Sequence, residues 1–374
     1  MIEFINVKKS FKDKVVIKDM SLKINKGELA VFIGLSGCGK TTSLKMINKL
    51  TKITSGKILI DGKDISKEDT IELRRNMGYV IQQTGVFPHM TVKENIELIP
   101  RLQKIDIDEI EKMTLVLLEM VGLNAEEYMN RYPSELSGGQ QQRIGVARAF
   151  ATQPDIILMD EPFSALDPIT RSELQEELFN LQQEVKKTIV FVTHDMDEAL
   201  KLADRICILK DGEIVQYDTP ENILRHPAGA YVEEFIGKNR IWSNPEFIKA
   251  KDIMIEDPVA ISGKRTILQG IDIMKKNKVD SLLITDRFGK LSGLVTLKDI
   301  KKDANKTSRL EEIMDEEIIT VKEDDNLVNI LETMNEYGIG YVPVVNDKKL
   351  VGLITRSSLL SILSEQFIDM EVKA

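Results

Sequence analysis

The stretch Gly34-Leu-Ser-Gly-Cys-Gly-Lys-Thr41 decides how the first part of this chain folds. It follows an apolar, strand-like run at 29–33 and precedes a helix-like run at 42–50. Glycines allow successive backbone N–H groups to turn inward around phosphate oxygens, and the start of the helix adds its dipole. The pattern GxxxxGKT between a strand and a helix therefore predicts a nucleotide phosphate-binding loop rather than an ordinary glycine turn.

Individual residues near this loop have separate expected roles. Lys40 would reach the β- and γ-phosphates of ATP, and the hydroxyl of Thr41 would ligate Mg²⁺. Phe11 is a candidate for stacking on the adenine ring, although it could equally be a core aromatic. The residues expected to contact the nucleotide are Phe11, Val16, Gly34, Ser36, Gly37, Cys38, Gly39, Lys40, Thr41 and Thr42.

The composition bounds the class of protein. The 374 residues are 42% hydrophobic and 30% charged, with a net charge of −9, which suits two or three domains of a soluble protein and argues against a surface that coats nucleic acid. No apolar run approaches the roughly 20 residues that span a bilayer, and the start of the chain lacks the regions of a signal peptide. Two cysteines predict a reducing compartment without disulfides. We therefore expect a cytoplasmic protein that can still dock on a membrane partner.

Three predicted strands end in polar side chains, at the sheet edge where parallel α/β folds bind their ligands. Gln82 follows one strand and could reach Mg²⁺ or the attacking water. Asp160 and Glu161 end the next, where Asp160 would hold Mg²⁺ through a water and Glu161 would be the general base. His194, one of three histidines, follows the third and is a candidate for contact with the γ-phosphate. A solvated acidic turn and a structural histidine are the alternatives.

A second candidate anion site lies at Leu136-Ser-Gly-Gly-Gln140. Here Ser137, Gly138, Gly139 and Gln140 stand before a helix-forming run, so that a helix start would again present backbone N–H groups to an anion. One chain with two such helix starts suggests a dimer in which each copy completes the site of the other.

Together these motifs resemble the nucleotide-binding subunit of an ATP-binding-cassette (ABC) transporter over residues 1–237. The similarity lies in the phosphate loop, Gln82, the LSGGQ signature at 136–140, Asp160-Glu161, the 164–167 loop and His194, in the family's order. The resemblance implies an α/β fold with a helical subdomain, here at 91–132, and a head-to-tail homodimer that sandwiches two ATP molecules. Because no site looks degenerate, we expect hydrolysis at both.

The same resemblance implies membrane partners. In the family, a groove beside the Gln82 strand receives a coupling helix of an integral membrane permease subunit. Its expected lining here is Val86-Phe-Pro-His-Met90, with packing of Phe87 and Met90 beneath the helical region as the alternative. An extracytoplasmic substrate-binding subunit would complete the complex, and this protein would lie peripherally on the cytoplasmic face of the membrane.

The surroundings of the motifs resemble the importers of quaternary-amine osmolytes, which carry glycine betaine, carnitine, choline, proline or proline betaine. The similar runs are 79–83, 136–149, 158–171 and 193–199. The resemblance therefore implies an ATPase that powers uptake of a compatible solute for osmoprotection. An importer of another solute, a soluble cassette protein of DNA repair or translation, and a slow nucleotide-sensing cassette are the alternatives.

The last part of the chain is a repeat. Met254 returns as Met314, an offset of 314 − 254 = 60, and Gly293 returns as Gly352, an offset of 352 − 293 = 59. The lost residue falls in a predicted hairpin turn, where a deletion is best tolerated. Each copy has the order strand, helix, strand, strand, helix, and two copies favour a pseudo-twofold pair over a solenoid.

Each copy resembles a CBS (α+β) domain, which sets the predicted boundaries. These are the ABC ATP-binding domain at 1–237, a linker at 238–250 interpreted from its polar residues and Pro245, the first CBS domain at 251–308, the second at 309–368 and a tail at 369–374.

The CBS resemblance implies a module that binds adenosine-containing ligands. In osmolyte importers such tails can bind cyclic di-AMP between two chains and inhibit transport. Thr296 and Asp299 match the family's ribose-contacting pattern, whereas the second copy has Ser358 in place of the acid. The expected regulatory residues are Val259, Thr296, Asp299, Tyr341 for stacking, Thr355, and Arg356 for phosphate. Dimerisation without a ligand and direct sensing of ionic strength are the alternatives.

Overall fold

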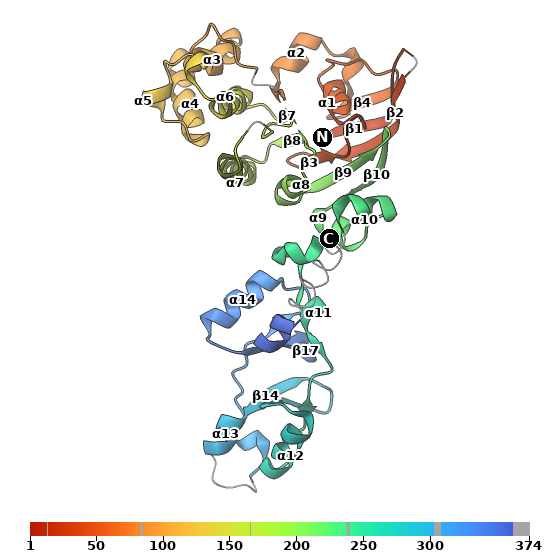
Figure 1. The fold of residues 1–374 in the computed structure, drawn as a ribbon, viewed down its shortest axis with the longest axis vertical. Helices are drawn as coiled ribbons and strands as arrows, with labels where there is room; N and C mark the ends of the chain where they lie inside the picture. The colour runs from red at the N-terminus through yellow and green to blue at the C-terminus, as the bar shows by residue number, and fades with distance from the viewer. Residues whose placement is uncertain (13, 83–84, 165, 238–239, 303–307, 362–374) are drawn as a thin grey trace. The chain divides into compact units, whose positions relative to one another are not determined.

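The computed structural model describes residues 1–374 except 13, 83–84, 165, 238–239, 303–307 and 362–374 (Figure 1). The positions outside the described residues include Asp13, Gln83, Ala165 of the 164–167 loop and the predicted tail 369–374. The chain forms two compact units, Met1–Ile236 and Gly237–Ala374.

A ten-stranded mixed sheet forms the centre of the first unit, in the order β5-β4-β1-β2-β10-β9-β3-β8-β7-β6. Its parallel strands are β3 (Leu29–Ile33), β8 (Thr188–Val192), β7 (Ile156–Asp160) and β6 (Met77–Val80), with β9 (Arg205–Lys210) parallel to β3. All residues of β3, β7 and β8 are buried. Such continuous apolar runs are typical of strands that are covered on both faces.

The other half of this sheet is largely antiparallel. Its strands are β1 (Ile2–Phe11), β2 (Lys14–Ile24), β4 (Ser55–Ile60), β5 (Lys63–Asp64) and β10 (Glu213–Asp218). Asp-Gly turns close two hairpins in this half, at Asp61-Gly62 between β4 and β5 and at Asp211-Gly212 between β9 and β10. Both residues of each turn have positive φ, as a two-residue hairpin turn of this kind requires.

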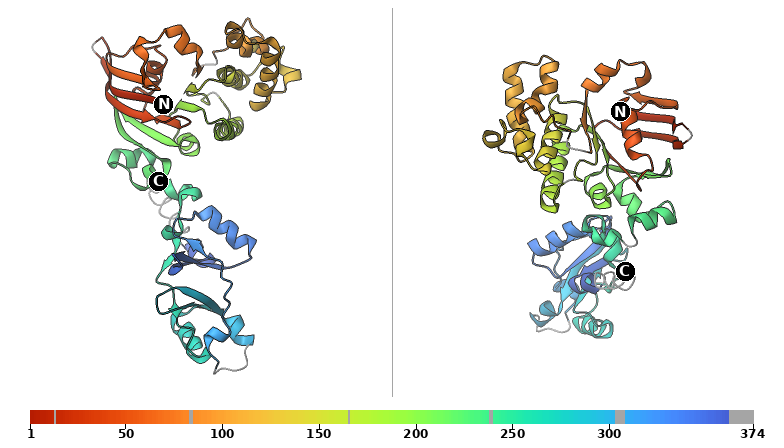
Figure 2. Two further views of the ribbon diagram at one scale, coloured as in Figure 1. Left: turned by 180° about the vertical axis from the view of Figure 1, so that it is seen from behind. Right: turned by 45° about the horizontal axis from the view of Figure 1, so that its top comes forward.

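Helices flank the sheet. They are α1 (Lys40–Ile47), α2 (Thr70–Arg75), α3 (Val92–Leu102), α4 (Ile107–Met120), α5 (Ala125–Tyr128), α6 (Gly138–Phe150), α7 (Pro168–Val185), α8 (Met196–Leu202), α9 (Pro220–Arg225) and α10 (Ala230–Ile236), with short 3₁₀ turns at Ile65–Lys67 and Pro133–Glu135. Helices α3 to α6 gather beside the end of the sheet that carries β7, away from α1 (Figures 1 and 2). The predicted helical region at 91–132 is thus confirmed, as three separate helices rather than one.

Alternate residues of the central strand β3 pack into two cores. Leu29, Val31 and Ile33 belong to the core shared with α3, α4 and α6, while Ala30 and Phe32 belong to the core shared with α1. This is the period-two alternation of a strand with two covered faces. It fixes the carboxyl end of β3, and with it the phosphate loop, between two packed layers.

The second unit contains two small sheets, β12-β13-β14 and β11-β17-β16-β15. The elements of the first copy are β11 (Ile255–Glu256), β12 (Ala260–Ile261), α12 (Ile267–Asn277), β13 (Ser281–Thr285), β14 (Leu291–Thr296) and α13 (Leu297–Lys302). Those of the second are a 3₁₀ turn (Leu310–Glu312), β15 (Val321–Lys322), α14 (Leu327–Glu336), β16 (Tyr341–Asn346) and β17 (Lys349–Thr355), followed by helical residues 356–361. The predicted repeat, and its shorter second hairpin, are confirmed.

The two copies exchange their leading segments. Strand β11 of the first copy pairs with β17 of the second, and Asp315 at the start of the second copy pairs with Leu294 of β14 in the first. A Cβ atom on Gly352 would lie 2.4 Å from the sulfur of Met254, and one on Gly293 would lie 2.4 Å from the sulfur of Met314. The repeated glycines therefore leave room for the repeated methionines, each across the boundary between copies.

The segment predicted as a linker contains short helical elements and buried residues. Residues before the first copy form 3₁₀ turns at Arg240–Ser243 and Pro245–Phe247 and a helix, α11 (Ala250–Ile253). Ile248 and Ala250 are buried in the same core as Val342 and Ile354 of the second copy. Pro245 starts a helical turn instead of marking free chain. Ile248 and Ala250 thus pack as part of the second unit, and the linker boundary at residue 250 stays a prediction.

Candidate active site

Strand β3 and helix α1 hold the phosphate loop between them. Gly39 caps the helix with φ 110°, and Lys40 is the first helical residue. A Cβ atom on Gly34 would lie 2.2 Å from the backbone oxygen of Leu209, and one on Gly39 would lie 2.4 Å from Cδ1 of Ile17. The loop is therefore pressed against β9 and β2, and only glycine fits at these two positions.

The ammonium of Lys40 lies inside the loop. Its Nζ donates to the carbonyl oxygens of Gly34 at 2.7 Å and Leu35 at 3.2 Å, and its side chain is buried. A buried cation surrounded by the loop backbone, at the start of a helix, attracts an anion. This matches the expected contact with the terminal phosphates.

Phe11 and Val16 lie on the neighbouring strands β1 and β2. Phe11 is 49% exposed, with the ammonium of Lys9 4.2 Å from the centre of its ring. The alternative of a core aromatic is therefore wrong. Val16 is half-buried, and its carbonyl oxygen would lie 3.2 Å from a Cβ atom on Gly39. Val16 is thus adjacent to the phosphate loop.

The remaining loop residues differ in exposure. Ser36 and Gly37 are exposed, Thr42 is half-buried and Cys38 is buried. The side chain of Cys38 belongs to the core on the α1 side of the sheet, and burial raises the pKa of its thiol. Only the backbone of Cys38 can face a nucleotide from this position.

The hydroxyl of Thr41 and the carboxylate of Asp160 meet beside the loop. Thr41 Oγ1 donates to Asp160 Oδ1 at 2.8 Å, and the ammonium of Lys45 lies 4.0 Å from Asp160 Oδ2. The side chain of Asp160 is buried, and burial raises the pKa of its carboxyl group. A hydroxyl and a carboxylate at this separation are hard oxygen donors of the kind that Mg²⁺ selects.

Glu161 follows Asp160 directly and has its own set of partners. It has φ 48°, an uncommon backbone conformation for a residue other than glycine, and its N–H donates to the carbonyl of Val192 at 2.9 Å. Its Oε2 accepts from Gln82 Nε2 at 3.1 Å and lies 3.2 Å from Nδ1 of His194. The three predicted catalytic residues therefore meet at one carboxylate oxygen.

The LSGGQ signature is the start of α6. Ser137 is the N-cap: its Oγ accepts from the N–H of Gln140 at 3.2 Å, while Gln140 Oε1 accepts from the N–H of Ser137 at 2.9 Å. This capping box fixes the first turn. Nothing lies within 4 Å of the Cβ position of Gly138, which is exposed. The backbone is therefore open to approach by another molecule.

The predicted coupling segment is held by Asn95, a buried residue of α3 that sequence reasoning missed. Asn95 Oδ1 accepts from the N–H of Phe87 at 2.7 Å, and its Nδ2 donates to the carbonyls of Phe87, Met90 and Thr91. Phe87 is 40% exposed and lies under the guanidinium of Arg148. Phe87 is therefore not packed beneath the helical region. Met90 is half-buried.

The predicted regulatory residues of the second unit fall on both copies. Thr296 Oγ1 donates to Asp299 Oδ2 at 2.6 Å, and the N–H of Thr296 donates to the same oxygen at 2.9 Å. Tyr341 lies in register with Thr355, and its phenol has a raised pKa because of burial and of nearby carboxylates, Asp299 first among them. The charge of Asp299 in the first copy therefore acts on the phenol of Tyr341 in the second.

The other two regulatory candidates are placed differently. Val259 packs against the core of the first copy, and its carbonyl accepts from the N–H of Leu283. Arg356 is exposed, and its N–H donates to the carbonyl of Gly340 at 3.1 Å. The guanidinium of Arg356 is therefore available to an anion, whereas Val259 offers only a half-buried apolar surface.

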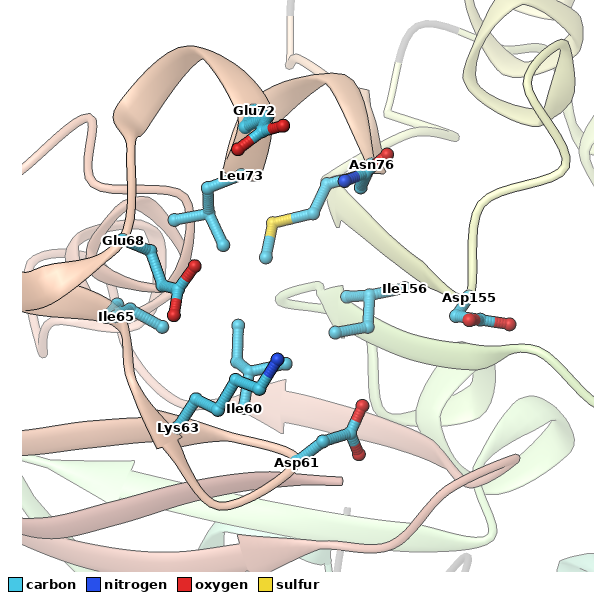
Figure 3. Close-up of a pocket in the computed structure, with 11 residues that line it drawn as sticks. Ile60, Asp61, Lys63, Ile65, Glu68, Glu72, Leu73, Asn76, Asp155 and Ile156 are labelled. Carbon is cyan, nitrogen blue, oxygen red and sulfur yellow. The ribbon is translucent and has the colours of Figure 1, made fainter.

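A cavity of about 240 Å³ lies at the opposite ends of β6 and β7 from Gln82 and Glu161 (Figure 3). Its apolar lining is Ile60, Ile65, Leu73, Met77 and Ile156, and its polar lining is Asp61, Lys63, Glu68, Glu72, Asn76 and Asp155. None of the residues predicted to bind nucleotide or metal lines it. The cavity is thus distinct from the site at the carboxyl ends of the strands.

Comparison with known proteins agrees with this geometry. The family model of the ABC transporter matches residues 17–164, and that of the CBS domain matches 250–305 and 310–365. The chain is 50% identical to the carnitine transport ATP-binding protein OpuCA of Listeria monocytogenes, over 97% of this chain and 92% of that protein. This chain belongs to the ABC transporter family.

Two further relatives extend the likeness of this ABC ATPase. The choline transport ATP-binding protein OpuBA of Bacillus subtilis is 50% identical over 97% of this chain and 96% of its own length. A solved dimeric structure of the ATP-binding cassette MJ0796, bound to ADP and Pi, matches with a TM-score of 0.55 and 37% identity over 59% of this chain and 99% of that one. Within the described residues, no helix is both long and apolar enough to cross a bilayer.

Proposed function

We propose that this protein is the ATP-hydrolysing subunit of an importer of quaternary-amine osmolytes such as glycine betaine, carnitine, choline or proline betaine. The meeting of Gln82 and His194 on one oxygen of Glu161, beside the phosphate loop, carries the hydrolytic half of this proposal. The transported class rests on the names of relatives that are 50% identical over nearly the whole chain.

The nucleotide would lie along the phosphate loop. Lys40 and the loop N–H groups would hold the terminal phosphates, and Phe11 would stack on the base with Val16 beside the loop. The hydroxyl of Thr41 and the carboxylate of Asp160 would hold Mg²⁺, which neutralises phosphate charge when bound. Gln82 donates to Glu161 through its amide nitrogen, and its amide oxygen would be the atom that contacts this metal.

Glu161 would act as the general base. Its carboxylate oxygen would accept a proton from the attacking water, and Gln82 and His194 would hold that carboxylate in place through their nitrogens. His194 is exposed on the side away from this contact, so that it could also donate to a phosphate oxygen. The left-handed φ of Glu161 keeps its side chain off the direction taken by Asp160.

A second copy would complete each site. The exposed N-terminus of α6 at Ser137 and Gly138 would face the γ-phosphate held by the partner's phosphate loop. Gly139 and Gln140 would support this contact through the capped first turn. A head-to-tail homodimer would therefore hold two ATP molecules, and both sites would be competent.

The importer would place this protein peripherally on the cytoplasmic face of the membrane. Integral permease subunits would contact the segment at 86–90, where Phe87 is exposed and the backbone is held by Asn95. An extracytoplasmic subunit would select the solute. We propose no nucleic-acid partner.

The CBS copies would regulate transport by binding cyclic di-AMP or another adenine nucleotide. Asp299, oriented by Thr296, would accept from a ribose hydroxyl, Tyr341 would stack on a base, and Arg356 would contact phosphate. Thr355 and Val259 would border this ligand. Dimerisation alone, or a response to ionic strength, are the competing roles for the module.

One experiment tests these proposals together. The protein would be purified from detergent-solubilised membranes with its permease, reconstituted in vesicles, and its ATPase activity measured against each osmolyte, salt and cyclic di-AMP. We expect stimulation by one or more quaternary amines and inhibition by cyclic di-AMP. Recovery without any membrane subunit would contradict the transporter proposal, whereas stimulation by an unrelated solute alone would contradict only the substrate class.

A further inference from the structure

A buried glutamate on α8 contacts the residue before His194. Glu198 is 6% exposed, and its carboxylate accepts from the hydroxyl of Thr193 at 2.6 Å and from Nε2 of Gln175 at 3.3 Å. Among the described residues, no cation lies within ion-pair distance of this carboxylate. Burial raises the pKa of this carboxyl group and makes its charged form costly, so that its hydrogen bonds to Thr193 and Gln175 are what stabilise it in this position.

The hydroxyl of Thr193 links the two residues that flank His194. It donates to Glu198 and accepts from the N–H of Asp195 at 3.0 Å. The carboxylate of Asp195 in turn accepts from the N–H groups of Asp197 and Glu198 at the start of α8. Hydrogen bonds of Thr193 and Asp195 thus hold the turn that carries His194 on either side of that residue. The His194 side chain itself is 65% exposed and reaches Glu161.

Helix α7 provides the other side of this network. Gln175 and Arg171 are four residues apart, and therefore on one face of the helix. Gln175 reaches Glu198, and the guanidinium of Arg171 lies 3.9 Å from Asp195 and donates to the carbonyl of Leu166 at 3.0 Å. The His194 turn is joined in this way to the segment that precedes α7.

We propose that Glu198 is a positioning residue for ATP hydrolysis, which holds the His194 turn against α7 through Thr193 and Gln175. The inference rests on the proposed role of His194 and extends it. Because the imidazole has no burial of its own to fix it, its distance from Glu161 depends on the turn beneath it. A shift of this turn would misplace the imidazole without touching the phosphate loop.

Glu198→Gln in the full-length protein tests the proposal. A glutamine has one accepting oxygen where the carboxylate has two, so it can keep the contact with Thr193 only by presenting its amide nitrogen to Gln175, whose own amide must then turn over. We expect kcat to fall about tenfold with an unchanged KM for ATP, and the ring signals of His194 to shift in NMR spectra. The chain has three histidines, so that His194→Ala assigns these signals.

Glu28→Gln is the matched control. Glu28 is also buried, at 8% exposed, and accepts from the hydroxyl of Tyr217 at 2.8 Å and from Nδ2 of Asn25 at 2.7 Å. Its replacement should affect folding stability to a comparable degree and leave both kcat and the His194 signals unchanged. Equal losses of kcat in the two variants would overturn the proposal and assign Glu198 to stability alone.

A paired exchange keeps the test decisive if the single variant folds poorly. In Glu198→Gln with Gln175→Glu, the new amide can accept from Thr193 and donate to the new carboxylate. We expect this double variant to recover most of the lost kcat. A folded double variant with kcat as low as the His194→Ala protein would overturn the proposal, and so would a wild-type kcat in Glu198→Gln. If His194→Ala itself retained full activity, the proposed role of His194 would fail instead.

Discussion

Nε2 of Gln82 lies 3.1 Å from Oε2 of Glu161, and Nδ1 of His194 lies 3.2 Å from the same oxygen. These residues follow β6, β7 and β8, which are neighbours in the sheet. Parallel strands end at one edge of a sheet, and this brings Gln82 and His194 to the same carboxylate oxygen of Glu161. The three side chains therefore form one hydrogen-bonded cluster centred on Glu161.

Glu161→Gln should abolish turnover and keep ATP binding. The amide has the shape of the carboxylate but cannot accept a proton from water, so we expect kcat to fall by about 10²- to 10⁴-fold. Gel filtration with ATP should then detect a trapped dimer. The exposed Glu176 on α7 provides a control, since Glu176→Gln should behave as wild type. Normal turnover of Glu161→Gln would remove this residue from the mechanism.

Gly293→Ala should destabilise the second unit. Its new Cβ atom would lie 2.4 Å from the sulfur of Met314, and overpacking of this kind costs about 1–3 kcal/mol. Urea unfolding followed through Trp242, the single tryptophan, measures the effect. Gly340→Ala is the control, because nothing lies within 4 Å of that position. Adding Met314→Ala should recover part of the loss, and no recovery would show that the contact is not its cause.

Asn95→Ala should separate hydrolysis from transport. It leaves the carbonyls of Phe87, Met90 and Thr91 without their shared donor and costs about 1–3 kcal/mol. We expect the purified protein to retain ATPase activity, while reconstituted transport falls. Lys112→Ala on the exposed face of α4 should change neither. Full transport by Asn95→Ala would contradict a coupling role for this segment.

Thr296→Val should lower stability in a pH-dependent way. Although burial raises it, hydrogen bonds from Thr296 keep the pKa of Asp299 below its ordinary value. A carboxyl with a lowered folded pKa adds stability above its unfolded pKa, near pH 4, and loses it as pH falls through the folded pKa. The deficit of the variant should therefore be present at pH 7 and shrink below about pH 4.

Thr355→Val is the matched control for this pH dependence. It stands at the equivalent position of the second copy, where Thr355 Oγ1 accepts from the N–H of Ser358 and no carboxylate takes part. Thr355→Val should lower the free energy of unfolding by the same amount at pH 7 and below about pH 4. A deficit of Thr296→Val that does not change with pH would contradict the assignment to Asp299.

Arg356→Ala should weaken cyclic di-AMP binding about 10-fold or more, the usual value of a hydrogen bond to a charged group. Basal ATPase activity should be retained, because this residue lies in the second unit. Calorimetry measures the affinity, with exposed Lys348→Ala in the same copy as control. Equal affinity in the two variants would place the ligand elsewhere on the module.

The sequence was sufficient to predict the strands that end at the ligand edge. Uninterrupted apolar runs predict β3, β7 and β8, and the last two runs lead into polar residues, so that the sequence alone places Asp160 and His194 at this edge. The convergence of Gln82 and His194 on one oxygen of Glu161 could not be predicted. It depends on the left-handed backbone at Glu161, which the sequence does not signal.

Four other features also escaped sequence reasoning. Asn95 and Glu198 are polar residues on the buried faces of helices, and a polar residue among apolar ones was the available signal. The polar residues before Ile248 favoured a linker at this point, so that its burial could not be predicted. The exchange of leading segments was hidden because sequence repeats report where copies begin and not which sheet each segment joins.

The exchange of leading segments decides how short a fragment of the second unit can be and still contain complete sheets. Strand β11 is encoded with the first copy and completes the sheet of the second, while Asp315 is encoded with the second and pairs with the first. A gene fragment that encoded the second copy alone would leave its sheet without β11 and Gly352 without Met254, and one that encoded the first copy alone would leave Leu294 without its bridge to Asp315 and Gly293 without Met314. Recombination can therefore move this tail between proteins only as a pair, with residues 248–256 included.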